Sequence, residues 1–208
     1  MSIKEVFDGV LSFNAAKVIA LTKTELDSGT EINSILNDGL IGALDLVGKK
    51  FSDGEIFVPE MLQAAKAMKA GLEVLKPYLS SESIASKGTI IIGTVKGDLH
   101  DIGKNLVVMM MEGAGFNVVD LGVDVDPDNF VKAASEHNAD VLGLSALLTT
   151  TMPAMGNTVA AIKKAGLAVR TIIGGAPVTE TFADQIGADG YSDDAPGAVE
   201  LARKLMAI

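Results

Sequence analysis

Gly97-Asp98-Leu99-His100-Asp101-Ile102-Gly103 separates two segments of different periodicity and decides the fold of this chain. The segment before it, residues 89–95, is rich in Ile and uncharged, which is typical of a strand buried on both faces. The segment after it, residues 102–113, has apolar residues at helical spacing. The quoted stretch is therefore predicted to be a strand-to-helix turn at the carboxyl end of a parallel strand, where α/β folds bind ligands.

This turn places a carboxylate two residues before an imidazole. Asp98 is close enough to accept a hydrogen bond from one ring nitrogen of His100 and to direct the other outward, as a metal-binding imidazole requires. Gly97 and Gly103 have no side chains, so a large flat ligand can approach the backbone. The simpler alternative is a surface turn in which Asp98 caps the following helix and His100 is solvated. The chain has only two histidines, and the turn does not stand alone.

Two more short patterns come at the ends of predicted strands. Ser145-Ala146-Leu147 ends one strand, and Gly174-Gly175 comes directly after another. Together with the Asp-x-His-x-x-Gly pattern of residues 98–103, they resemble the corrinoid-binding signature of the cobalamin-dependent methyltransferases, in the same order. The chain is also similar to the cobalamin-binding module of cobalamin-dependent methionine synthase. The resemblance covers nearly the whole chain.

The first 78 residues show helical periodicity and no convincing strand. Four helices are predicted, over residues 3–11, over residues 12–27, from just after Thr30 to beyond Val47, and from Pro59 to Pro77. Their short connections indicate a small antiparallel four-helix bundle, which the resemblance identifies as a cap. Residues 80–87 are polar and patternless, so we expect a cap domain with its linker over residues 1–87 and a second domain over residues 88–208.

Strands and helices alternate in this second domain. The strands are expected near residues 89–95, 117–121, 141–145, 169–173 and 190–191, and the helices near residues 102–113, 127–136, 153–164, 180–185 and 196–206. Five such units predict an α/β fold with a flavodoxin-like (Rossmann-like) parallel five-stranded sheet in the order 2-1-3-4-5. That order brings the His100 turn beside Ser145.

Composition excludes several classes of function. The chain has no cysteine, which excludes disulfides and thiolate metal sites, and its net charge of -10 disfavours nucleic acid binding. Apolar runs are interrupted before they reach spanning length, so no membrane helix is expected. The N-terminal residues 1–5 lack a signal-peptide pattern, and we expect a cytoplasmic protein.

The resemblance assigns roles to individual residues. It implies that cobalamin binds with its dimethylbenzimidazole base displaced into a slot in the sheet, and that His100 becomes the lower axial ligand of cobalt, with Asp98 and Thr151 as its relay partners. The implied cofactor-binding residues of the α/β domain are Gly97, Asp98, Leu99, His100, Asp101, Ile102, Gly103, Ser145, Leu147, Thr149, Gly174, Gly175, Tyr191 and Ala195. In the cap, Phe57 and Met61 (or Ala65) are implied to cover the upper face of the corrin.

Each of these assignments has a simpler alternative. Thr149 and Thr151 could be hydroxyl caps of a helix, Gly174-Gly175 a plain turn, residues 191–195 a helix cap, and Phe57 and Met61 ordinary core. The acidic run from Asp124 to Asp128 looks like a calcium loop, but it lacks the required Gly and Glu at the later loop positions. We interpret Asp126 instead as the cap of a helix that begins at Pro127.

The implied function is that of a corrinoid methyl-carrier protein, which is not catalytic alone and cycles between Co(I) and methyl-Co(III). Its implied partners are a donor-specific methyltransferase (for a methoxyarene, methanol or a methylamine), an acceptor methyltransferase that uses tetrahydrofolate or a thiol coenzyme, and a corrinoid-activating reductase. Three alternatives remain open at this point. They are the cobalamin-binding subunit of an adenosylcobalamin-dependent isomerase, a non-catalytic cobalamin sensor or storage module, and a flavodoxin-like fold without a corrinoid.

Overall fold

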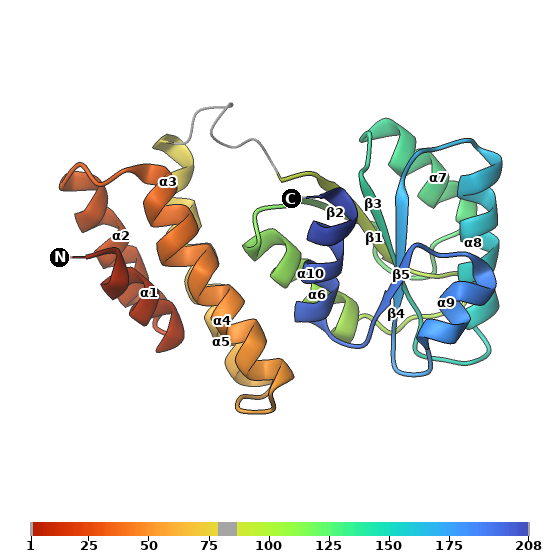
Figure 1. Cartoon of the computed structure of the whole chain (residues 1–208), viewed down its shortest axis with the longest axis horizontal. Coiled ribbons are helices and arrows are strands. Elements are labelled where there is room, and N and C mark those ends of the chain that lie inside the picture. The colour runs from red at the N-terminus through yellow and green to blue at the C-terminus, as the bar shows by residue number, and fades with distance from the viewer. Residues whose placement is uncertain (1, 79–86, 208) are drawn as a thin grey trace. The chain divides into compact units, whose positions relative to one another are not determined.

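The structure is a computed structural model that describes residues 2–78 and 87–207. It contains two compact units, a helical unit and an α/β unit (Figure 1). The predicted linker over residues 80–87 lies outside the described residues except for Lys87, so the boundary between residues 87 and 88 stays a prediction.

The helical unit contains the four predicted helices, but two of them differ in detail from the sequence-based expectation. Its elements are α1 (Ile3–Leu11), α2 (Ala15–Asp27), α3 (Ile32–Ser34), the π-helical segment η1 (Ile35–Ile41), α4 (Gly42–Ser52), α5 (Val58–Leu75) and the 3-10 turn η2 (Lys76–Tyr78). The predicted third helix is the continuous run of α3, η1 and α4, whose wider middle turns the periodicity did not reveal.

The second helix begins three residues later than predicted. Phe13 has a φ of 59°, which ends any helix entering from Ser12. The side chain of Asn14 then accepts a hydrogen bond from Lys17 N at 3.0 Å and caps α2. Pro59 lies in the first turn of α5, as predicted.

The α/β unit has the predicted parallel sheet in the order β2-β1-β3-β4-β5. Its strands are β1 (Thr89–Thr94), β2 (Asn117–Asp120), β3 (Val141–Ser145), β4 (Arg170–Gly174) and β5 (Gly190–Ser192). Its helices are α6 (Ile102–Gly113), α7 (Pro127–Glu136), α8 (Met152–Lys164), α9 (Glu180–Ile186) and α10 (Ala195–Met206). In Figure 1, α6 and α10 cover one face of the sheet, and α7 and α8 cover the other.

The register of the central strands positions the site. Thr94, the last residue of β1, lies opposite Ser145, the last residue of β3. The loops that follow these two strands therefore begin side by side at the carboxyl edge of the sheet, as the predicted strand order requires.

β4 ends one residue later than predicted, at Gly174. Among residues 2–78 and 87–207, no helix has both the length and the hydrophobicity that crossing a bilayer demands.

Candidate functional site

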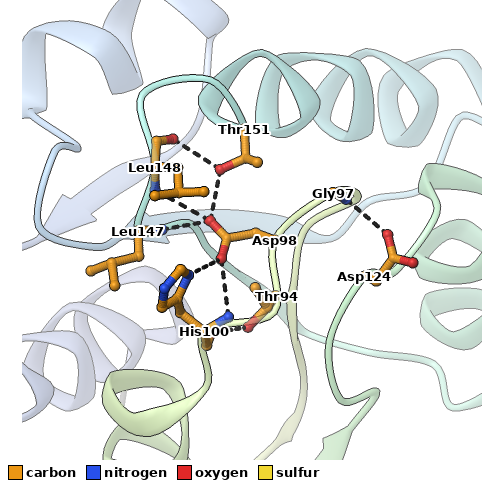
Figure 2. A network of polar contacts seen from close by, with 8 residues as sticks. All are labelled: Thr94, Gly97, Asp98, His100, Asp124, Leu147, Leu148 and Thr151. Carbon is orange, nitrogen blue, oxygen red and sulfur yellow. Dashed lines mark hydrogen bonds and ion pairs between the residues drawn. The ribbon is translucent and has the colours of Figure 1, made fainter.

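The loop between β1 and α6 holds a buried carboxylate against a half-exposed imidazole (Figure 2). Asp98 is 0% exposed, whereas the His100 side chain is 50% exposed. Asp98 Oδ1 lies 2.7 Å from His100 Nδ1 and accepts a second bond from the His100 backbone N–H at 3.0 Å. The hydrogen bond expected from the sequence is therefore present, and Nε2 is the ring nitrogen left to bind a ligand.

The other carboxylate oxygen of Asp98 is bound by the loop between β3 and α8. Asp98 Oδ2 accepts hydrogen bonds from Leu147 N at 2.8 Å, Leu148 N at 3.3 Å and Thr151 Oγ1 at 2.7 Å (Figure 2). These partners belong to the loop after β3, so the alternative in which Asp98 caps α6 is wrong. The β1 and β3 loops are thus joined through one side chain.

These contacts determine the charge of Asp98. Burial alone raises the pKa of this carboxyl group. The hydrogen bonds from the Thr151 hydroxyl, from the backbone and ring of His100 and from the Leu147 N–H outweigh it, and they hold the pKa well below its usual range. Asp98 is ionised at neutral pH and can only accept, so the proton of a neutral His100 ring must be on Nδ1.

Two residues that the sequence did not identify complete the support of the turn. Thr94 Oγ1 donates to the carbonyl oxygen of His100 at 2.9 Å. Asp124 Oδ1 accepts from Gly97 N at 2.8 Å, and Asp124 N donates to the carbonyl oxygen of Asp98 at 3.0 Å. Gly97 has a φ of 85°, a conformation that favours glycine. A hydroxyl at the end of an otherwise apolar strand was the available signal for Thr94.

The predicted role of Asp126 needs a correction. Asp126 does occupy the position before α7, which begins at Pro127 as expected, but its side chain makes no capping hydrogen bond. Asp126 Oδ2 instead accepts a bond from Lys96 Nζ at 3.3 Å. The Asp126 carboxylate therefore binds the Lys96 ammonium group and not the backbone N–H groups at the start of α7.

The loop that contains His100 and the loop after β3 both carry exposed apolar side chains. Leu99 is 71% exposed and Ile102 is 82% exposed, and Leu147 and Leu148 are each a little over 40% exposed. Large apolar side chains this exposed around one polar anchor are typical of a binding surface for a flat, mostly apolar ligand. Leu148 was not predicted as a site residue.

The remaining predicted residues near the turn have more ordinary surroundings. Asp101 accepts a bond from Asn105 Nδ2 at 3.0 Å, which occupies one of its carboxylate oxygens. A Cβ atom on Gly103 would meet nothing within 4 Å, so the space beside it is open. Ser145 is half-buried, and Thr149 is exposed. Their roles toward a cofactor stay predictions.

At the ends of β4 and β5, several predicted site residues make close packing or capping contacts, and their roles toward a cofactor stay predictions. A Cβ atom on Gly174 would lie 2.9 Å from Ser192 O of the neighbouring strand, and one on Gly175 would lie 1.9 Å from Ala146 O, so both glycines allow close approach of neighbouring backbone. Asp194 caps α10 by accepting from Gly197 N at 2.7 Å, which confirms the helix-cap alternative for this segment.

Four further residues predicted to contact the cofactor differ in accessibility. Tyr191 is half-buried and Ala195 is buried. In the helical unit, Phe57 is 68% exposed, whereas Met61 is fully buried and offers no surface to a ligand in this structure. The cap role of Phe57 and Met61 stays a prediction.

The available donors match one kind of metal group. Within residues 2–78 and 87–207, no cluster of three or more His, Asp or Glu side chains could enclose a metal ion, and the chain has no cysteine. His100 offers one nitrogen, so a metal bound here must bring its other ligands in a preformed frame, as a metal in a macrocycle does. A single imidazole nitrogen, on a turn that also carries exposed apolar side chains, would suit a metal held in a flat macrocycle such as a corrin.

Known proteins match both units. A model described as a B12 binding domain matches residues 88–200, and a second with the same description matches residues 2–76. Dimethylamine corrinoid protein 1 of Methanosarcina acetivorans is 43% identical over 99% of this chain and 97% of its own length. A corrinoid protein of Desulfitobacterium hafniense is 37% identical over 98% of this chain and 97% of its own length.

A solved structure agrees with these sequence relatives. In the crystal structure of the methanol:cobalamin methyltransferase complex MtaBC from Methanosarcina barkeri, one chain is similar at a TM-score of 0.87 and 28% identity, over 99% of this chain and 79% of that chain. Matches of this coverage, together with an aspartate-held imidazole at the carboxyl edge of a five-stranded parallel sheet, place the chain in the family of the B12-binding corrinoid proteins.

Proposed function

We propose that this chain carries a methyl group between two enzymes on the cobalt of a bound corrinoid. The observation that carries the proposal is the Asp98–His100 pair, in which a buried, ionised carboxylate fixes one ring nitrogen and leaves the other half exposed. The cofactor supplies the chemistry, because its cobalt can be both methylated and reduced to a nucleophile. The protein's residues supply position, charge and shielding.

The residues of the turn have distinct tasks in this proposal. His100 would bind cobalt through Nε2, and Leu99 and Ile102 would lie against the apolar ring. Asp98 would orient the imidazole by holding Nδ1, with its negative charge beside the ring. Thr151, which donates to Asp98 Oδ2 at 2.7 Å, would keep that carboxylate in place.

The helical unit completes the proposed carrier. It matches a B12 binding domain model over residues 2–76, and Phe57 at the start of α5 presents an exposed aromatic ring. A cap of this kind would shield the methylated cofactor from water and would have to open for each methyl transfer.

The carrier needs partner enzymes. The structurally similar chain comes from a methanol:cobalamin methyltransferase complex, and one relative is named for dimethylamine. We therefore propose a donor-specific methyltransferase as the first partner, with methanol, a methylamine or a methoxyarene as donor classes. A methyltransferase that uses tetrahydrofolate or a thiol coenzyme would accept the methyl group, and a reductase would restore oxidised cobalt. The proposal includes a cytoplasmic location, where such partners would act.

The relatives favour this function over the alternatives raised by the sequence. Relatives named as corrinoid proteins match both units over nearly the full chain, including the helical unit that a methyl carrier uses as a cap. Neither an adenosylcobalamin-dependent isomerase subunit nor a cobalamin sensor or storage module receives comparable support from the observations described above.

A cobalamin titration tests the proposal directly. Hydroxocobalamin added to the purified chain is expected to give the visible spectrum of an imidazole-ligated cobalt, and His100→Ala should bind more weakly and lose that spectrum. His137→Ala is the matched control, because His137 is the other histidine of the chain. An imidazole-ligated spectrum that survives His100→Ala contradicts the proposal, as does the absence of binding by the unmodified chain.

A second measurement tests the transfer itself. The reduced, cobalamin-loaded protein is incubated with candidate methyltransferases and isotopically labelled methanol, methylamines or methoxyarenes. Label is expected on the cofactor with one donor class and its matching enzyme. If no combination of donor and enzyme labels the reduced cofactor, the chain binds cobalamin but does not carry methyl groups, and the proposed function is wrong.

A further inference from the structure

Thr94 is a buried polar residue outside the set of residues that hold or contact the proposed cofactor. It is the last residue of β1 and is 0% exposed. Its hydroxyl donates to the carbonyl oxygen of His100 at 2.9 Å. Buried hydroxyls are normally hydrogen-bonded, and the partner of this one is the backbone of the residue proposed to bind cobalt.

The bonds between Asp98 and His100 leave one freedom that Thr94 removes. Both the backbone N–H and the Nδ1 of His100 bond to the same atom, Asp98 Oδ1, at 3.0 Å and 2.7 Å. Neither of these two bonds holds the backbone carbonyl group of His100. The Thr94 bond reaches the carbonyl on the far side of the residue, so His100 is held at two separate points (Figure 2).

Thr94 itself is fixed by its neighbours. Its backbone N–H donates to Gly122 O at 2.9 Å, and its carbonyl oxygen accepts from Val125 N at 3.0 Å. It also lies opposite Ser145 in the register of the sheet. The hydroxyl therefore transmits the rigid position of the central strand to the backbone of His100.

We propose that Thr94 is a positioning residue, which sets the direction of the His100 ring so that Nδ1 stays on Asp98 and Nε2 stays turned outward. Thr94 does not contact the cofactor in this role. The inference concerns the folded protein with or without cobalamin, and only the second part of its test rests on the proposed function.

The test uses the tautomer of the His100 ring, which nitrogen NMR of 15N-histidine-labelled full-length protein reports at pH 8. In the unmodified chain, the ionised Asp98 is expected to keep the proton on Nδ1. In Thr94→Val, a change that keeps side-chain volume but removes the hydroxyl, the ratio of the Nδ1–H to the Nε2–H form should fall, by up to about tenfold if the whole energy of one typical hydrogen bond acts on the ring. Thr94→Ser should restore it.

Thr158→Val is the matched control. Thr158 is also 0% exposed and also donates its hydroxyl to a backbone carbonyl, that of Ala154, at 2.9 Å. This control should lose stability without changing the His100 tautomer, and His137 should report no change in any variant. A Thr94→Val spectrum identical to that of the unmodified chain overturns the proposal. If Thr94→Val does not fold, Thr94→Ala takes its place, and an unchanged ratio there overturns the proposal equally.

Cobalamin binding provides the second readout. With hydroxocobalamin bound, the imidazole-ligated fraction in the visible spectrum should fall in Thr94→Val and remain unchanged in Thr158→Val. An equal fraction in Thr94→Val and in the unmodified chain contradicts the positioning role toward the cofactor. If the unmodified chain itself shows no imidazole ligation, the proposed function fails, and the tautomer measurement still decides the role of Thr94.

Discussion

Two aspartates at opposite edges of the same sheet accept similar hydrogen bonds but hold different basic side chains. Asp98, at the carboxyl edge, accepts from Thr151 Oγ1 at 2.7 Å and from a backbone N–H at 2.8 Å, and it holds His100. Asp189, at the amino edge, accepts from Thr171 N at 2.7 Å and Thr171 Oγ1 at 3.1 Å, and it holds Arg170 at 3.0 Å.

The difference lies in the side chain that each carboxylate holds. The guanidinium of Arg170 only donates hydrogen bonds and is always charged. Its pair with Asp189 is therefore a structural contact and leaves no nitrogen atom that could bind a metal. The imidazole of His100 has a second nitrogen that can bind a metal or a proton. The bonds of the carboxylate alone do not identify a functional site; the chemistry of its basic partner does.

The largest expected effect on stability comes from neutralising Asp98, and neutralising Asp189 provides the comparison. Asp98→Asn places an amide against several donors in a fully buried position, so we expect the free energy of unfolding to fall by about 3 kcal/mol. Asp189→Asn should cost only about 1 kcal/mol, because its partner Arg170 is 59% exposed. Urea unfolding at pH 7 measures both, and equal losses would remove the distinction.

Acid should separate the two aspartates next. Burial raises the pKa of Asp189, but the hydrogen bonds from Thr171 and Arg170 lower it by more than burial raises it. Both carboxyl groups therefore have folded-state pKa values below that of an unfolded aspartate, about 3.9. Their stabilisation is fully present above that pH and is lost as the pH falls through the lowered folded-state values.

Unfolding free energies measured between pH 6 and pH 2 test this sign. The decline below about pH 4 should be shallower in Asp98→Asn than in the unmodified chain, because the larger pKa shift belongs to Asp98. Asp189→Asn should reduce the slope less. A slope that Asp98→Asn leaves unaltered would mean that this carboxyl group has an ordinary pKa.

The two threonines provide a matched pair of intermediate effect. Thr151→Val and Thr171→Val each remove a hydroxyl that donates to an aspartate, and each should cost about 1 kcal/mol of stability. Only Thr151→Val should also weaken the imidazole-ligated spectrum of bound hydroxocobalamin. Loss of that spectrum in Thr171→Val would show that general stability, and not the carboxyl edge, controls ligation.

The smallest expected effect on stability comes from an exposed apolar side chain. Ile102 is 82% exposed, so Ile102→Ser should change the free energy of unfolding by less than about 0.5 kcal/mol. It should nevertheless weaken cobalamin binding measurably, because the corrin would lose an apolar contact. Tyr78→Ser, at a residue 61% exposed in the helical unit, is the control and should leave binding unchanged.

The sheet was predictable because its signals are local. β1 and β3 are short apolar runs, so their type followed from local sequence, and the alternation of strands and helices along the chain then predicted the strand order. The start of α2 and the π-helical segment η1 were not predictable, because a positive φ at Phe13 and a change of helical pitch leave no mark in hydrophobic periodicity.

The candidate site was predictable only in part. Asp98 and His100 are two residues apart, and family resemblance supplied Thr151, whose hydroxyl does reach Asp98. Thr94 and Asp124 were missed, because one acts on a backbone carbonyl and the other on backbone groups, and such partners depend on the loop conformation.

The separation in sequence between the partners of Asp98 has a consequence for assembly. Thr151 lies 53 residues beyond Asp98 in sequence and Leu147 lies 49 residues beyond it, so an unfolded chain cannot hold the imidazole in its ligating direction. If His100 binds cobalt as proposed, the cofactor would be loaded only after β1 and β3 have paired. Because it would then bind the native state alone, each tenfold rise in free cobalamin above its dissociation constant would add about 1.4 kcal/mol to the free energy of unfolding.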